Sequence, residues 1–329
     1  MAINLLDIKP NVISRDLSGY ITYIYGAPKV GKTSFGVRMP KHLILGFERG
    51  TNALPGAMVQ PINSWGELKQ VVRELKKPEV QETYKSLIID TADIASDMCQ
   101  KYICNQLGIE NIGDGGWSNN GWAKYKKEFE ETFRTLSMLG YAIVFISHVK
   151  ETTQKEKSGA EYLAIRPSIQ SSALAILENL ADIYGYAHQV QREDGTQAVV
   201  LTLRAPAGQN IACGSRFKYI APEIEFSYDS LTKALNDAID AEAAHNGNNY
   251  ITEERVAYKA DQTYDYDALV SEFETLVGQL MTKDQGYYTP RITQIIDKYL
   301  GKGKKVSQTT PDQAELVYLI VDEIKSELM

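Results

Sequence analysis

The chain has 329 residues, of which 43% are hydrophobic and 23% charged, which suits one large domain plus a smaller one and excludes wholesale disorder. No apolar run approaches the ~20 residues that a membrane span needs, so we expect no membrane partner. The three cysteines, Cys99, Cys104 and Cys213, form no disulfide framework, which favours a cytoplasmic location. The net charge of −7 is unevenly distributed: residues 221–329 contain 10 basic and 20 acidic residues, whereas residues 1–220 contain 25 and 22. This asymmetry indicates two units with different partners.

The first two thirds of the chain alternate strand-like and helix-like segments. Strands are predicted at 20–25, 42–47, 86–90 and 141–147, and helices at 32–39, 64–76, 92–106 and 121–139. Uninterrupted apolar strands are typical of a parallel sheet covered by helices on both faces. Residues 182–190 and 197–204 flank a turn and predict an antiparallel hairpin at the sheet edge. The predicted fold class is therefore α/β.

The last third of the chain is predicted to be helical. A helix over 230–244 precedes a polar stretch, and 245–265 is the best linker candidate. Three amphipathic helices are predicted beyond it, at 266–282, 288–300 and 311–328. The predicted division is a core at 1–228, a helix and linker at 229–265, and a C-terminal helical domain at 266–329.

The strongest motif is GAPKVGKT, Gly26 to Thr33, between a predicted strand and a predicted helix. Such a glycine-containing loop points its backbone N–H groups at phosphates, Lys32 can reach the β- and γ-phosphates, and the Thr33 hydroxyl can bind Mg²⁺. ATP and Mg²⁺ are the expected cofactors. The predicted nucleotide contacts are Gly26, Ala27, Pro28, Lys29, Val30, Gly31, Lys32, Thr33 and Ser34.

Polar residues end three of the predicted strands. Asp90 closes LIID and is expected to hold the metal together with Thr33, although many strands end in an Asp that caps a helix. Glu48 follows the strand 42–47 and could activate water as a general base, or simply pair with Arg49 at the surface. His148, in ISHVK, could sense the γ-phosphate, or be a satisfied histidine at a strand terminus.

With these motifs in order, together with GGWSNNGWAKYKKEF, residues 18–220 resemble the RecA/RadA-like ATPases. The similarity is greatest to the small phage relatives that accompany phage recombination systems, the Sak-type ATPases. The resemblance implies a RecA-like P-loop core with a mostly parallel sheet and an antiparallel edge hairpin, to which a small C-terminal helical unit is added. It also implies a catalytic role for Glu48 and Lys32, a γ-phosphate switch at His148, and a location in the host cytoplasm.

RecA relatives bind single-stranded DNA through two loops, which the resemblance places at about 108–122 and 150–166. The candidate DNA contacts there are Trp117, Trp122, Lys124, Lys150, Lys155, Lys157 and Arg166. Aromatic rings can stack on bases and lysines can contact phosphates, but Trp122 could equally belong to a helix core. Arg204 and Arg216 are candidates for a finger that acts on a neighbouring subunit's nucleotide, or for a structural ion pair.

The predicted function is a Mg²⁺-ATP-dependent DNA-recombination ATPase that binds single-stranded DNA and assists annealing or strand exchange. It is expected to assemble with itself as a filament or ring. The C-terminal helices could dock a single-strand-binding protein or an annealase, or simply cover the core. The alternatives are a helicase, helicase loader or packaging-type motor, and a non-catalytic scaffold switched by nucleotide.

Overall fold

The computed structural model describes residues 13–114, 116, 120–155, 161–246, 251–252 and 264–328. By internal contacts the chain divides into two compact units, Met1–Lys259 and Ala260–Met329. The finer boundaries expected at residues 228 and 265 stay predictions. Helix α8 (Tyr228–Asn246) packs into the core of the first unit through residues that include Leu231 and Leu235.

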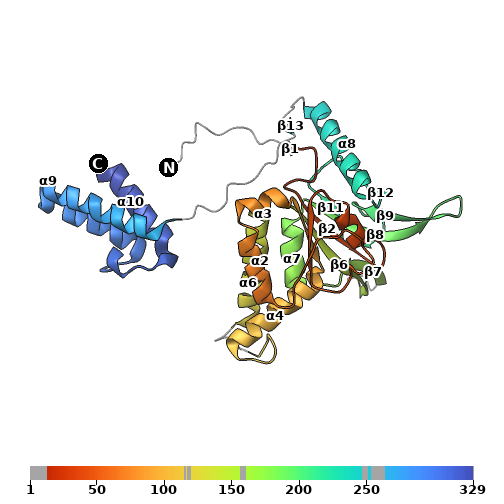
Figure 1. The fold of residues 1–329 in the computed structure, drawn as a ribbon, viewed down its shortest axis with the longest axis horizontal. Helices are drawn as coiled ribbons and strands as arrows, with labels where there is room; N and C mark the ends of the chain where they lie inside the picture. The colour runs from red at the N-terminus through yellow and green to blue at the C-terminus, as the bar shows by residue number, and fades with distance from the viewer. Residues whose placement is uncertain are drawn as a thin grey trace. The chain divides into compact units, whose positions relative to one another are not determined.

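The first unit is built on an eleven-stranded sheet, shown in Figure 1. Its centre is β2 (Ile21–Gly26), which pairs in parallel with β6 (Ala142–Lys155) on one side and β8 (Ile183–Gln191) on the other. Beyond β6 the sheet continues, still parallel, through β5 (Ser86–Asp90), β3 (His42–Gly46) and β4 (Val59–Pro61). Beyond β8 it continues antiparallel through β9 (Gln197–Thr202) and β12 (Glu223–Glu225). The predicted α/β fold with a mostly parallel sheet and an antiparallel edge hairpin is confirmed.

Five further strands are found in the described residues. They are β7 (Glu161–Pro167), antiparallel to β6; β10 (Asn210–Ile211), parallel to β7; β11 (Gly214–Ser215), antiparallel to β8; and the separate parallel pair β1 (Ile13–Ser14) and β13 (Ile251–Thr252).

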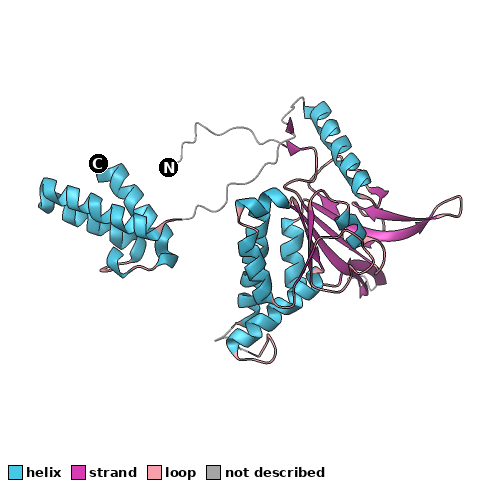
Figure 2. Cartoon of the chain, in the orientation of Figure 1, coloured by secondary structure: helices cyan, strands magenta, loops and turns pink. Residues whose placement is uncertain are grey.

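Helices cover both faces of the sheet, as Figure 2 shows. One face is covered by α2 (Trp65–Glu74), α4 (Ala92–Leu107), α6 (Gly121–Met138) and α7 (Ser171–Leu180), and the other by α1 (Lys32–Val37) and α8; α3 (Pro78–Thr83) follows α2. Every residue of β5 is buried, as expected for a strand covered on both sides.

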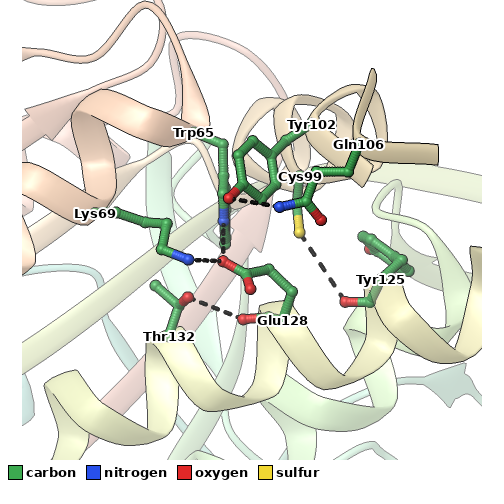
Figure 3. A network of polar contacts seen from close by, with 8 residues as sticks. All are labelled: Trp65, Lys69, Cys99, Tyr102, Gln106, Tyr125, Glu128 and Thr132. Carbon is green, nitrogen blue, oxygen red and sulfur yellow. Dashed lines mark hydrogen bonds and ion pairs between the residues drawn. The ribbon is translucent and has the colours of Figure 1, made fainter. Parts of the chain in front are cut away.

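A polar network ties the helices of the first face together (Figure 3). The indole Nε1 of buried Trp65 on α2 donates to Glu128 Oε1 on α6 at 2.9 Å, and Lys69 Nζ donates to the same oxygen at 2.8 Å. That ammonium group also lies 5.4 Å from the centroid of the Tyr102 ring on α4. Because an unpaired buried N–H is costly, Glu128 fixes how α2 packs on α6.

The second unit is helical and has a core of its own. Helix α9 (Tyr266–Leu300) contains a non-helical residue, Asp284, with φ −162° and ψ 96°, so it consists of two helical segments. Helix α10 (Ala314–Leu328) packs against α9, with Leu280, Val317 and Ile320 fully buried between them. The 3₁₀ turns Val306–Gln308 and Pro311–Gln313 lie between the two helices in sequence. Within the described residues, no helix combines the length and apolarity needed to cross a membrane.

One prediction about local structure is wrong. The segment 150–166 was expected to be a loop, but residues up to 155 continue β6, and β7 returns alongside them. The register runs from Val149 opposite Pro167 to Lys155 opposite Glu161. Antiparallel pairing gives the backbone of this ribbon its hydrogen-bond partners, and the β-branched Thr152 and Thr153 suit a strand.

Candidate nucleotide site at the carboxyl edge of the sheet

The loop Gly26–Thr33 joins the carboxyl end of β2 to α1. Gly26 touches the neighbouring strand, because a Cβ built there would lie 2.2 Å from the carbonyl oxygen of Ala187. Gly31 is the N-cap residue of α1 and has a φ of 100°, a conformation that glycine adopts without strain. The side chains of Ala27, Pro28 and Lys29 are exposed, as expected for a loop whose backbone faces a ligand.

Lys32 is buried, with 6% of its surface exposed, and its ammonium group points back into the loop. Nζ donates to the carbonyl oxygens of Gly26 at 2.9 Å and Ala27 at 2.8 Å. Burial lowers the pKa of Lys32, and the nearby carboxylates of Asp90 and Glu48 oppose that shift. A buried cation with only carbonyl partners is well suited to exchange them for phosphate oxygens.

Asp90 ends β5, and one strand, β6, separates β5 from β2. Its Oδ2 accepts a hydrogen bond from Thr33 Oγ1 at 2.8 Å, so the two predicted metal ligands are in direct contact. Burial raises the pKa of Asp90, while the Thr33 hydrogen bond lowers it. A Cβ on Gly50 would stand 3.7 Å from Asp90 Oδ2, 3.9 Å from Glu48 Oε1 and 4.0 Å from Thr33 Oγ1.

The missing side chain of Gly50 therefore leaves room among three oxygen ligands. Mg²⁺ prefers oxygen ligands, and it takes one or two from protein carboxylates and the rest from phosphates and water. Thr33 and Asp90 fit such an ion.

Glu48 and His148 face each other across this edge. Glu48 Oε2 lies 3.7 Å from His148 Nε2, and about a third of each side chain is exposed, at 33% and 35% respectively. The partner of Glu48 is thus His148 rather than its sequence neighbour Arg49. His148 Nδ1 is buried and has no hydrogen-bond partner among the described residues. The strands bring together Glu48 and His148, which lie 100 positions apart in the sequence.

A second carboxylate, Asp93, connects this edge to the β6–β7 ribbon. Its Oδ2 accepts from the backbone N–H of His148 at 3.2 Å, and its Oδ1 accepts from Ser168 Oγ at 2.5 Å. The N–H of Ser168 in turn donates to the carbonyl of His148 at 2.9 Å. Nothing in the sequence marks Asp93 as a functional residue, because an acidic residue in the first turn of a helix is ordinary at that position.

Most described DNA candidates are exposed. Trp122 is 42% exposed at the start of α6, with its ring edge-on to Tyr125, so it does not belong to the helix core. Lys124 and Lys150 are exposed as well. Arg166 on β7 donates to Asn210 Oδ1 at 2.9 Å. Trp117, Lys157 and the side chain of Lys155 lie outside the described residues.

The two finger candidates each have a polar partner within the first unit. Arg216 contacts Asp182 Oδ1 at 3.1 Å, and Asp182 Oδ2 accepts from the N–H of Ile21, at the amino end of β2. Arg204 follows β9, which runs antiparallel to β8, and donates to the carbonyl of Lys218 at 3.0 Å. Arg216 therefore lies at the amino edge, whereas the phosphate loop is at the carboxyl edge. Arg204 comes two residues after Thr202, which pairs with Tyr186 of β8, and Tyr186 in turn pairs with Tyr25 of β2, one residue before the phosphate loop.

Comparison with known proteins agrees with this geometry. A family model described as an AAA domain matches residues 18–210, more than half of the chain and all of the edge described above. The chain belongs to the AAA domain family. It is also similar to the SPbeta prophage-derived uncharacterized protein YorG of Bacillus subtilis (strain 168), with 29% identity over 332 residues, covering 100% of this chain and 99% of that protein. Family membership makes the first unit a nucleotide-binding P-loop domain.

Proposed function

We propose that the protein is a Mg²⁺-dependent ATPase that binds single-stranded DNA in an ATP-controlled way and assists annealing or strand exchange, as the Sak-type relatives that it resembles do. The observation that carries the proposal is the meeting of the Lys32 loop, Asp90, Glu48 and His148 at one edge of the sheet. A lysine loop for the phosphates, a carboxylate for the metal and a second carboxylate to orient water are recurring parts of sites for phosphoryl transfer to water.

Each of these side chains has a distinct task. Lys32 exchanges its carbonyl partners for β- and γ-phosphate oxygens, and Thr33 with Asp90 would hold Mg²⁺, which would supply charge stabilisation when bound. Glu48 accepts the proton of the attacking water, since its carboxylate lies beside the metal ligands and is open to solvent. His148 contacts Glu48 and is placed to respond to the γ-phosphate.

The route to DNA begins at His148, because β6 continues without interruption from the nucleotide edge into the β6–β7 ribbon. Asp93 and Ser168 hold the two strands of the ribbon together at its base. Lys150 is exposed on this ribbon. A shift of His148 on hydrolysis would therefore move the ribbon, and with it the lysine that we propose contacts backbone phosphates.

We also propose that copies of the chain assemble, as a filament or ring. We propose that Arg204 or Arg216 serves a neighbouring subunit's nucleotide. Arg216 lies at the amino edge of the sheet, away from the phosphate loop of its own chain. The C-terminal helical unit, with its separate core, is proposed to dock a single-strand-binding protein or an annealase.

ATP hydrolysis with and without single-stranded DNA tests the proposal, together with DNA binding in the presence of ATP, a non-hydrolysable analogue or no nucleotide. We expect DNA to stimulate hydrolysis and the analogue to tighten DNA binding. Lys150→Glu should weaken DNA binding, whereas Lys233→Glu, an exposed lysine on α8, serves as the matched control. Hydrolysis that ignores DNA, with no ATP-dependent DNA binding, would contradict the proposal. Directional unwinding would support a helicase instead.

A further inference from the structure

Phe226 lies directly beside the phosphate loop. Its Cε1 is 4.0 Å from the position that a Cβ on Gly31 would take. The ring is partly exposed. The space next to the start of α1 is thus open and bordered by an aromatic ring.

The surrounding structure holds this ring in a fixed orientation. Phe35 on α1 stacks against it with a centroid distance of 5.3 Å and an interplanar angle of 5°. The backbone N–H of Phe226 donates to the carbonyl of Val199 at 2.9 Å. The next residue, Ser227, accepts a hydrogen bond through its Oγ from the N–H of Ser230, in the first turn of α8. A partly exposed ring with so few degrees of freedom is a suitable stacking platform.

The order of the strands determines which end of a nucleotide would approach this ring. Asp90 and Glu48 follow strands on the β6 side of β2, so the γ-phosphate and its metal belong on that side. Phe226 follows β12, on the β8 side of β2. A nucleotide whose γ-phosphate faces Asp90 therefore extends its nucleoside toward Phe226.

We infer that Phe226 is the stacking platform for the nucleobase of the bound nucleoside triphosphate. The inference rests on the nucleotide site proposed above and adds to it the subsite for the base. An apolar ring recognises the π-face that every base has and reads no hydrogen-bonding edge. Phe226 therefore contributes affinity for nucleotides over bare polyphosphate, with little discrimination between ATP and GTP.

Calorimetric titration of the full-length chain with Mg²⁺-ATP and with Mg²⁺ and inorganic tripolyphosphate tests this assignment. Phe226→Leu removes the aromatic face and keeps an apolar side chain against Phe35, while Phe226→Tyr keeps the ring. Phe217→Leu removes a partly buried ring, edge-on to Tyr20, near the amino end of β2, and is the matched control. Thermal melting of each variant verifies that it is folded.

We expect Phe226→Leu to raise the Kd for ATP by about 5- to 150-fold, the usual range for losing one base–aromatic stack, and to leave the Kd for tripolyphosphate unchanged. Phe226→Tyr and Phe217→Leu should resemble wild type. An unchanged ratio of the two Kd values in Phe226→Leu would overturn the base platform alone. A wild-type protein that binds neither ligand would overturn the nucleotide site itself and this inference with it.

Discussion

Replacing Asp90 by Asn should stabilise the nucleotide-free protein while removing its ability to hold the metal. Asp90 is 3% exposed, and burial is the largest cause of its raised pKa. An Asn at this position keeps an oxygen that accepts the Thr33 hydroxyl at 2.8 Å, but carries no charge that must be desolvated near Glu48. We expect a gain of about 0.5–2 kcal/mol in the free energy of unfolding, the size of other single stabilising changes.

Because the pKa of Asp90 is raised in the folded protein, the stability gained by Asp90→Asn should depend on pH. Since the folded pKa of Asp90 lies above the unfolded value, the folded state binds the proton more tightly, and wild type loses stability as the pH rises from the unfolded to the folded pKa. The advantage of Asp90→Asn should therefore be full at neutral pH and disappear in acid, where Asp90 is protonated in both states.

Thermal melting in EDTA without nucleotide measures this prediction, and a gain of that size corresponds to a Tm rise of roughly 1–8 °C. Asp240→Asn is the control, because Asp240 is exposed, its hydrogen bond from Arg15 lowers its pKa, and its loss should not raise the Tm. Mg²⁺-ATP should raise the Tm of wild type more than that of Asp90→Asn. A lower Tm for Asp90→Asn at neutral pH would refute the argument that burial of the charge dominates.

Three other variants test other parts of the structure. Gly26→Ala should destabilise the first unit by about 1–3 kcal/mol and weaken ATP binding, since its Cβ would lie 2.2 Å from the Ala187 carbonyl oxygen. Gly66→Ala is the control, because a Cβ there meets Ser64 Oγ at 3.8 Å, and thermal melting should show no loss of stability for this variant. Glu128→Ala should lower the free energy of unfolding by about 1–3 kcal/mol in chemical denaturation, because it leaves the buried Trp65 N–H unpaired. An equal loss in Glu128→Gln would contradict that explanation. A chain ending at residue 259 should bind ATP as the full chain does in titrations, and loss of binding would show that the two units depend on each other.

Local sequence patterns predicted much of the sheet. The apolar runs at 42–47 and 86–90 became β3 and β5, because strands buried on both faces need uninterrupted apolar residues. The helix predicted over 64–76 is α2, and its N-cap Ser64 accepts the N–H of Glu67 through its side chain. Such signals lie within a few residues of one another, so they can be read without knowing the fold.

Features that depend on distant pairing could not be predicted in this way. The β6–β7 ribbon replaces the loop expected at 150–166, since its strand character depends on pairing between residues on either side of 156–160. The hydrogen bonds of Asp93 and the position of the Phe226 ring beside Gly31 bring together segments far apart in the sequence. The carboxylates at strand ends were predictable as a group, because carboxyl ends of parallel strands meet at one edge.

The central claim is that Glu48 activates water for ATP hydrolysis at the Lys32 loop. Steady-state ATP hydrolysis by Glu48→Gln, with ATP binding measured on the same preparation, tests it most directly. We expect turnover to fall by roughly 10²- to 10⁴-fold, the usual contribution of a general base, while the Kd for ATP stays close to that of wild type. Turnover equal to that of wild type would contradict the claim.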